Sequence, residues 1–132
     1  MNILPDTSVW SYALRRDAPS NCREVLRLRQ ALEGGESVFS TGLILQELLQ
    51  GFDGPKSRRR IIETFTELPF IIPETRDHIE AADLRNKLRR KGVQAGTIDA
   101  LLSHLCLRYG LSMLSLDDDF THIAKHTALA IL

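Results

Sequence analysis

Four acidic side chains occupy positions where a folded chain could bring them together. Asp6 follows an apolar run directly and precedes a helical pattern, so it is expected at the carboxyl end of a buried strand. Asp117 follows another apolar run, whereas Glu47 and Asp99 fall at the edges of predicted helices. Ligands of open α/β sheets bind in the crevice outside the carboxyl ends of the strands. We therefore expect the four carboxylates to converge on one site.

Several carboxylates can share a site only if something offsets their repulsion. Two unit charges about 5 Å apart repel by roughly 3 kcal/mol at an effective dielectric constant near 20. A divalent cation removes this penalty, and oxygen ligands with positions left to water suit Mg²⁺, or Mn²⁺ as its substitute. Such an ion lowers the pKa of its bound water and neutralises charge on a phosphoryl oxygen. The pattern therefore indicates phosphodiester hydrolysis.

Each of these acids also has an ordinary structural interpretation that stays open. Asp6 could form a turn or a cap, Glu47 could be a solvated helix residue, and Asp99 could only cap its helix. The run 117–119 could be the acidic start of a short helix, which is the better interpretation of Asp118. If Asp99 lies in a first helical turn, the helix N-terminus is expected to lower its pKa and keep it ionised.

Two further groups of polar residues are interpreted as structural. Asp77, Glu80 and Asp83 mark an acidic helix start without a strand end nearby, so we expect them on the surface. His122 and His126 have helical i, i+4 spacing and could share a metal ion. Zinc is disfavoured there because no third ligand is evident.

Short apolar runs alternate with longer helical patterns along the chain. Expected strands are the run that ends at Pro5 and residues 37–40, 70–73, 112–115 and 129–132. Expected helices cover residues 8–16, 20–32, 41–50, 56–66, 75–91, 97–109 and 118–125, with Ser20, Thr41 and Thr97 as N-caps and Gly110 after the sixth. This alternation predicts an α/β fold, a mainly parallel sheet of about five strands with helices on both faces.

Length and composition set the outer limits. The 132 residues suit a single domain covering 1–132, and 17 Lys and Arg balance 17 Asp and Glu, so any nucleic-acid affinity must come from uneven placement. Cys22 and Cys106 lack a metal or redox spacing and are expected as buried thiols. No apolar stretch approaches the roughly 20 residues of a membrane span, and no leader pattern opens the chain. A cytoplasmic location is expected.

Two basic stretches offer a route to RNA. Lys56, Arg58, Arg59 and Arg60 open a predicted helix, where cations oppose the helix dipole and so need another explanation. We predict phosphate contacts for them, with a solvated face or an acidic protein partner as the rival interpretations. The second stretch, within residues 85–91, ends a helix, where cations are favourable in any case.

Taken together, these motifs resemble the PIN-domain ribonucleases, and most closely the VapC toxins of toxin–antitoxin pairs. The resemblance covers essentially the whole chain. Each motif alone is weak evidence for the family, but the order and spacing of the motifs in a chain of this length are specific. The motifs are Asp6-Thr7-Ser8 after the first strand, Glu47 in the third helix, Asp99-Ala100-Leu101-Leu102 after a glycine turn, and Ser115-Leu116-Asp117-Asp118-Asp119-Phe120.

The resemblance implies a three-layer α/β/α sandwich and a role for each matching residue. Asp6, Glu47, Asp99 and Asp117 would form the catalytic quartet around Mg²⁺. Asp6, Asp99 and Asp117 would be the metal ligands, with Asp6 and Asp99 the most direct. Supporting roles fall to Asp119, which would assist through water, to Ser115, and to Thr7 and Ser8, which would orient Asp6. The implied partners are RNA, an antitoxin lying across the acidic groove, and a second copy in a homodimer.

One position departs from the family pattern. The residue before the first aspartate is usually a small or branched apolar one, and here it is Pro5. Proline has no N–H for a sheet ladder and is disfavoured inside central strands. We hypothesise that Asp6 is slightly displaced, which would weaken metal binding or activity.

The sequence therefore predicts a Mg²⁺-dependent endoribonuclease that acts as the toxin of a toxin–antitoxin pair. The alternative from another class is a PIN-like or flavodoxin-like binding module with little or no catalysis. Metal-dependent RNA cleavage that EDTA abolishes would separate the two.

Overall fold

A parallel sheet forms the centre of the molecule. The computed structural model describes residues 1–15 and 21–132, and in them the strands are ordered β2-β1-β3-β4, all parallel. Their bounds are Asn2–Pro5 for β1, Ser37–Val38 for β2, Ser112–Leu114 for β3 and Ala130–Ile131 for β4. Non-consecutive neighbours such as β1 and β3 put the crossovers, and with them the helices, on the two faces of the sheet.

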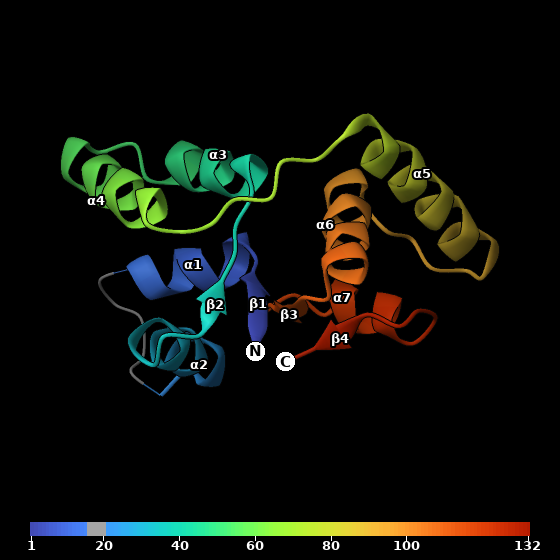
Figure 1. Ribbon diagram of the computed structural model, residues 1–132, viewed down its shortest axis with the longest axis horizontal. Coiled ribbons are helices and arrows are strands. Elements are labelled where there is room, and N and C mark those ends of the chain that lie inside the picture. Colours follow the sequence, from blue (N-terminus) through green and yellow to red (C-terminus); the bar gives the residue numbers. More distant parts are fainter. Residues whose placement is uncertain (16–20) are drawn as a thin grey trace.

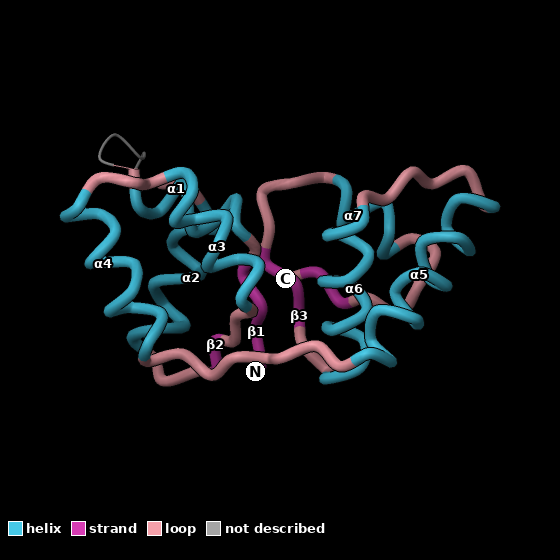
Figure 2. Tube along the Cα trace, turned by 90° about the horizontal axis from the view of Figure 1, so that it is seen from above, coloured by secondary structure: helices cyan, strands magenta, loops and turns pink. Residues whose placement is uncertain are grey.

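Helices cover both sides of this sheet, which confirms the predicted three-layer α/β/α arrangement. Figures 1 and 2 show α1 to α4 on one side of the strands and α5 to α7 on the other. The bounds are α1 Thr7–Leu14, α2 Arg23–Glu33, α3 Gly42–Gly51, α4 Pro55–Thr66, α5 Thr75–Arg90, α6 Thr97–Tyr109 and α7 Asp119–Ala124. None of the helices in this described part of the chain is long and apolar enough to cross a membrane.

Strands covered on both faces must be apolar along their whole length. Ile3 and Leu4 of β1 and Met113 and Leu114 of β3 are fully buried, and they lie at the centre of one continuous core. The apolar runs of β1 and β3 are therefore covered on both faces, whereas Ala130 and Ile131 of β4 are exposed. Trp10 of α1 joins the core and packs against Phe65 of α4, with ring centroids 4.8 Å apart.

The prediction of a strand at residues 70–73 is wrong. Phe70 makes only an isolated parallel bridge with Ser40, so the described sheet has four strands and one bridge instead of five strands. Proline at positions 69 and 73 explains the difference, because proline has no N–H with which to extend a ladder. Ile72, between them, is 80% exposed.

Most predicted helices are present, with shifted ends. The side chain of Thr41 caps α3 as predicted, accepting a hydrogen bond from Ile44 N at 3.4 Å. Gly96 rather than Thr97 is the N-cap of α6, which ends at Gly110 with a left-handed φ of 65°. The helix predicted from residue 20 begins at Arg23, and the proposed cap at Ser20 lies outside the described residues.

Pro5 is the last residue of β1 and does not interrupt its pairing with β3. Pro5 is in register with Leu114, and the next N–H, that of Asp6, donates to Leu114 O at 3.0 Å. Successive N–H groups of a strand point to opposite neighbours, so the missing N–H of Pro5 would face β2. That strand ends at Val38. The β1–β3 ladder therefore continues as far as Asp6.

Candidate active site

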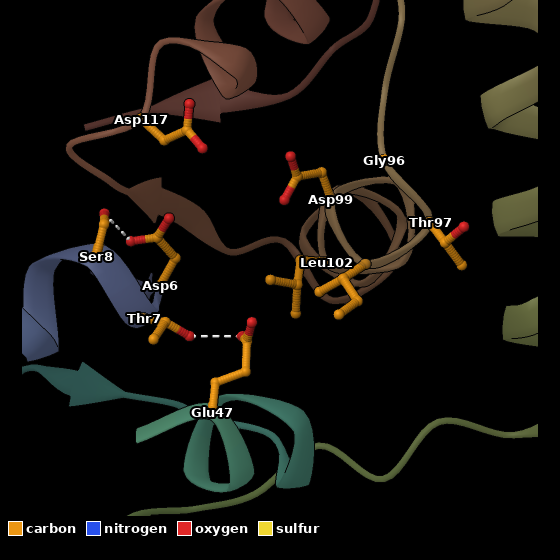
Figure 3. Close-up of a pocket in the computed structure, with 10 residues that line it drawn as sticks. Asp6, Thr7, Ser8, Glu47, Gly96, Thr97, Asp99, Leu102 and Asp117 are labelled. Carbon is orange, nitrogen blue, oxygen red and sulfur yellow. Dashed lines mark hydrogen bonds between the residues drawn. The ribbon is translucent and has the colours of Figure 1, made fainter. Parts of the chain in front are cut away.

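A cleft of about 500 Å³ opens at the carboxyl ends of β1 and β3. All four acids singled out in the sequence line it, together with Thr7, Ser8, residues 96–98 and Leu102. Figure 3 shows Glu47 pointing up toward Asp6, and Asp99 and Asp117 pointing into the same space from the opposite side. None of the described residues that line the cleft is Lys, Arg or His. The cleft is therefore strongly acidic although the chain as a whole is neutral.

Asp6 is both the cap of α1 and part of the cleft. Its Oδ1 accepts from Val9 N at 3.3 Å, which caps the helix, and from Ser8 Oγ at 2.5 Å. Its Oδ2 accepts from Ser115 Oγ at 2.6 Å. Burial raises the pKa of Asp6, while the hydrogen bonds from the two serines and from the backbone oppose that rise. Asp6 therefore both caps α1 and lines the acidic cleft.

The two serine hydroxyls also hold the segment that carries Asp117. Ser8 Oγ accepts from Leu116 N at 2.9 Å, and Ser115 Oγ accepts from Asp117 N at 2.9 Å. Each hydroxyl therefore donates to Asp6 and accepts from the 115–117 segment. We call this arrangement, formed by Asp6, Ser8 and Ser115, the serine clamp. It joins the start of α1 to the loop between β3 and α7.

Glu47 is positioned by a hydrogen bond from Thr7. Thr7 Oγ1 donates to Glu47 Oε1 at 2.7 Å, as the dashed line in Figure 3 marks. The predicted role of Thr7, orienting Asp6, therefore differs from its contact in the structure, whereas Ser8 does contact Asp6. Because Thr7 and Ser8 follow Asp6 directly, one short stretch of chain contacts two of the four carboxylates.

The pKa of Asp99 is raised to about 6, opposite to the expected direction. Burial is the largest cause, followed by the negative charges of Asp117, Asp119, Asp6 and Glu47. The first-turn position does not compensate, because a helix N-terminus contributes only a fraction of a unit charge. The raised pKa of Asp99 therefore reflects both its burial and the repulsion from the neighbouring carboxylates.

Three carboxylates lie close enough for a shared cation. One oxygen from each of Asp99, Asp117 and Asp119 lies within 4.8 Å of the other two. Asp119 N also donates to Asp117 Oδ1 at 3.0 Å, which fixes the relative position of these two residues. An all-oxygen donor set of this charge fits a hard divalent ion such as Mg²⁺. The sequence placed Asp119 only in a supporting role, but its carboxylate comes close enough to Asp99 and Asp117 to share an ion with them.

The basic run lies away from the cleft. Arg58 and Arg59 line a separate hollow on α4 together with Asp53 and Glu63, and Lys56 and Arg60 are exposed on the same helix. The structure therefore does not bring these four cations to the acids, and their contact with RNA stays a prediction.

Sequence reasoning missed a buried charge network between α5 and α6. Asp77 was expected on the surface, which is wrong: it is fully buried and accepts from Glu74 N at 2.7 Å and from Arg108 Nη1 at 2.8 Å. His104 Nε2 lies 2.9 Å from its Oδ1. The backbone hydrogen bond from Glu74, followed by the bonds from Arg108 and His104, holds the pKa of Asp77 well below its usual range.

Two signals in the sequence could have revealed this network. Glu74 and Asp77 have the spacing of a capping box, and His104 and Arg108 lie one turn apart on α6. Arg108 Nη1 donates to both oxygens of Asp77 at 2.8 Å, so the guanidinium offsets the charge of this buried carboxylate. The network is therefore a structural ion pair that fixes α5 against α6, the helix that carries Asp99.

Comparisons with known proteins identify the family. Residues 3–126 match the PIN domain model, and the chain belongs to the PIN domain family. A comparison with curated proteins gave no match.

Several solved structures share the fold. VapBC2 from Rickettsia felis, bound to a DNA fragment from their promoter, superposes with a TM-score of 0.77 at 17% identity, covering 100% of this chain and 98% of that one. VapBC-1 from nontypeable Haemophilus influenzae gives 0.75 at 17%, covering 100% and 97%. VapC20 from Mycobacterium tuberculosis, a Sarcin-Ricin loop cleaving toxin, gives 0.66 at 17%, covering 91% and 93%. At these identities the likeness concerns the fold.

Proposed function

We propose that the protein is a Mg²⁺-dependent endoribonuclease and the toxin of a toxin–antitoxin pair. The observation that carries the proposal is the cleft itself, where four carboxylates meet at the strand ends without a lining cation among the described residues. Such a concentration of negative charge is costly unless a divalent ion is bound. Membership of the PIN family and the shared fold with VapC toxins support the same activity.

The acidic side chains in and beside the cleft have two kinds of role in this proposal, metal binding and proton transfer. Asp6, Asp99 and Asp117 hold the ion, and Asp119 assists through water or by direct contact. A bound Mg²⁺ would supply Lewis-acid stabilisation of a phosphoryl oxygen and a water of lowered pKa. Glu47 Oε1 is taken by Thr7, which leaves Oε2 to accept a proton from the attacking water. The hydrogen bonds of the serine clamp favour the ionised form of Asp6 and oppose the rise in its pKa that burial causes.

An RNA cleavage assay tests the activity directly. The wild-type chain should cleave single-stranded RNA with Mg²⁺ or Mn²⁺, and EDTA should stop the reaction. Asp6→Ala should be inactive. Asp118→Ala is the matched control and should stay active, because Asp118 is exposed and lines no part of the cleft. Binding of RNA without metal-dependent products would favour the alternative, a PIN-like or flavodoxin-like binding module.

The partners follow from the same proposal. The structures of similar fold include VapBC complexes, and one was solved with promoter DNA. We propose a cognate antitoxin that covers the acidic groove, a homodimer, and a cytoplasmic location where RNA is available. Expression of the wild-type chain should arrest growth, and Asp6→Ala should not. Light scattering on the purified chain would measure its oligomeric state.

A further inference from the structure

A second hollow, of about 510 Å³, includes Asp119, whose carboxylate lies close to those of Asp99 and Asp117. It is lined by residues 92–94, which connect α5 to α6, and by Asp119, His122, Lys125 and His126 of α7 and the turn after it. The four side chains from the α7 region are all exposed. Their chemistry differs from that of the cleft, because one lysine and two imidazoles face a single carboxylate.

Asp119 connects the two sites. Its carboxylate lies within 4.8 Å of oxygens from Asp99 and Asp117, and the same residue lines the second hollow. The hollow therefore shares one residue with the group of three close carboxylates.

The hollow is better suited to an anion than to a metal ion. Neither His122 nor His126 belongs to a group of three close metal-ligating side chains in the described part of the chain. The ammonium group of Lys125 would repel a cation. Lysine is a common phosphate binder, and an imidazole keeps at least one N–H donor in either protonation state. Asp119 is the one lining group that opposes an anion, and a cation shared with Asp99 and Asp117 would offset its charge.

We propose that this hollow binds a backbone phosphate of the RNA next to the scissile one, with Lys125 as the principal contact and His122 and His126 as hydrogen-bond donors. The inference rests on the proposed ribonuclease function. An RNA strand carries a charge at every nucleotide, and the described lining of the cleft offers no cation for the phosphates that flank the reacting one. The hollow supplies the missing positive charge at the point where a strand would leave the cleft.

The salt dependence of RNA binding tests this subsite. We would measure the Kd of a short, labelled single-stranded RNA in a Glu47→Gln background, which removes the proposed proton acceptor, with Mg²⁺ and again with EDTA. Each phosphate contact to single-stranded RNA contributes about 0.7 to the slope of log K against log salt. Lys125→Gln should therefore make this negative slope shallower by about 0.7 and weaken RNA binding. The loss of affinity should be about threefold larger at roughly 50 mM than at roughly 200 mM salt.

Two further variants complete the design. His122→Ala combined with His126→Ala should weaken binding at both salt concentrations. Lys87→Gln is the matched control, since Lys87 is an exposed lysine of α5 that lines neither site, and it should leave the slope unchanged. All these side chains are exposed, so the variants should keep the wild-type Tm.

The outcomes separate the subsite from the activity. Metal-dependent cleavage together with an unchanged slope and Kd for both Lys125→Gln and the histidine pair would overturn the subsite and leave the ribonuclease proposal intact. A slope that falls with Lys125→Gln while the protein with Glu47 intact cleaves no RNA would keep the hollow as a phosphate site, but it would reject the activity and with it the place of that site next to a scissile phosphate. Unchanged RNA binding with weaker antitoxin binding would assign the hollow to a protein partner and overturn the inference.

Discussion

Asp99→Asn should stabilise the metal-free protein while it impairs metal binding. The rise in the pKa of Asp99 from its ordinary 3.8 to about 6 means that the folded state disfavours the ionised form. At about 1.4 kcal/mol for each tenfold change in proton affinity, the full cost is about 3 kcal/mol. Asp99 is partly exposed, and solvent and salt screen the charges around it, so we halve this figure to about 1.5 kcal/mol. For a chain of this size that corresponds to a rise in Tm of about 6 °C.

The pH dependence has a definite sign. When a carboxyl group has a higher pKa in the folded state than in the unfolded state, its ionisation lowers the free energy of unfolding. Its cost therefore begins as the pH rises above 3.8, the ordinary value, and is complete above about 6. The gain from Asp99→Asn should be about 1.5 kcal/mol near pH 7.5 and about 0.5 kcal/mol near pH 4.5.

Thermal melts in EDTA at these two pH values would measure the effect. Asp118→Asn is the matched control, because it removes one negative charge from an exposed position outside the cleft. Added Mg²⁺ should raise the Tm of the wild type more than that of Asp99→Asn. Because the pKa of Asp99 is raised, protonation of this carboxyl should also weaken Mg²⁺ binding as the pH falls from about 7 to about 5. Equal gains for Asp99→Asn and Asp118→Asn, or a gain that does not shrink at low pH, would refute the reasoning.

Three other substitutions probe the contacts around the cleft. Ser115→Ala removes a hydrogen bond to Asp6 and should lower the free energy of unfolding by about 1–2 kcal/mol in urea titrations; an unchanged midpoint would mean that the clamp adds no stability. Thr7→Val frees Glu47 and should slow single-turnover cleavage about tenfold at unchanged Mg²⁺ affinity, with Thr7→Ser restoring the rate. If Pro5 weakens the site as hypothesised, Pro5→Val should bind Mg²⁺ more tightly and cleave faster, and equal values would reject the hypothesis.

The main features of the fold could be predicted because burial dictates them locally. Strands covered by helices on both faces must be apolar, so β1 and β3 stand out in the sequence, and the residues that follow them lie at one edge of the sheet. The same logic places Asp6 and Asp117 near each other. Glu47 and Asp99 required the added order and spacing of the motifs, because each alone could be an ordinary helix residue.

The features that were missed depend on contacts between distant segments. The capping-box spacing of Glu74 and Asp77 indicates a helix start but not burial, and only the packing of α5 on α6 brings Arg108 and His104 to Asp77. The direction of the Asp99 pKa depends on how closely the other carboxylates approach, which spacing along the chain cannot give. At 70–73 the apolar residues predicted a strand, but the prolines that flank Phe70 and Ile72 prevent a ladder from extending there.

The serine clamp makes the proposed catalytic site depend on contacts between the two ends of the chain. Ser115 and Asp6 are 109 positions apart, and Ser8 and Leu116 are 108 apart, so these bonds close among the longest loops in the chain. Closing such long loops costs conformational entropy, so these contacts depend on the rest of the tertiary structure. A nascent or locally unravelled chain would retain the carboxylates of Asp6, Glu47 and Asp99 but not their arrangement. The hazardous activity proposed for this protein would then be withheld until synthesis has passed β3 and the completed sheet has closed.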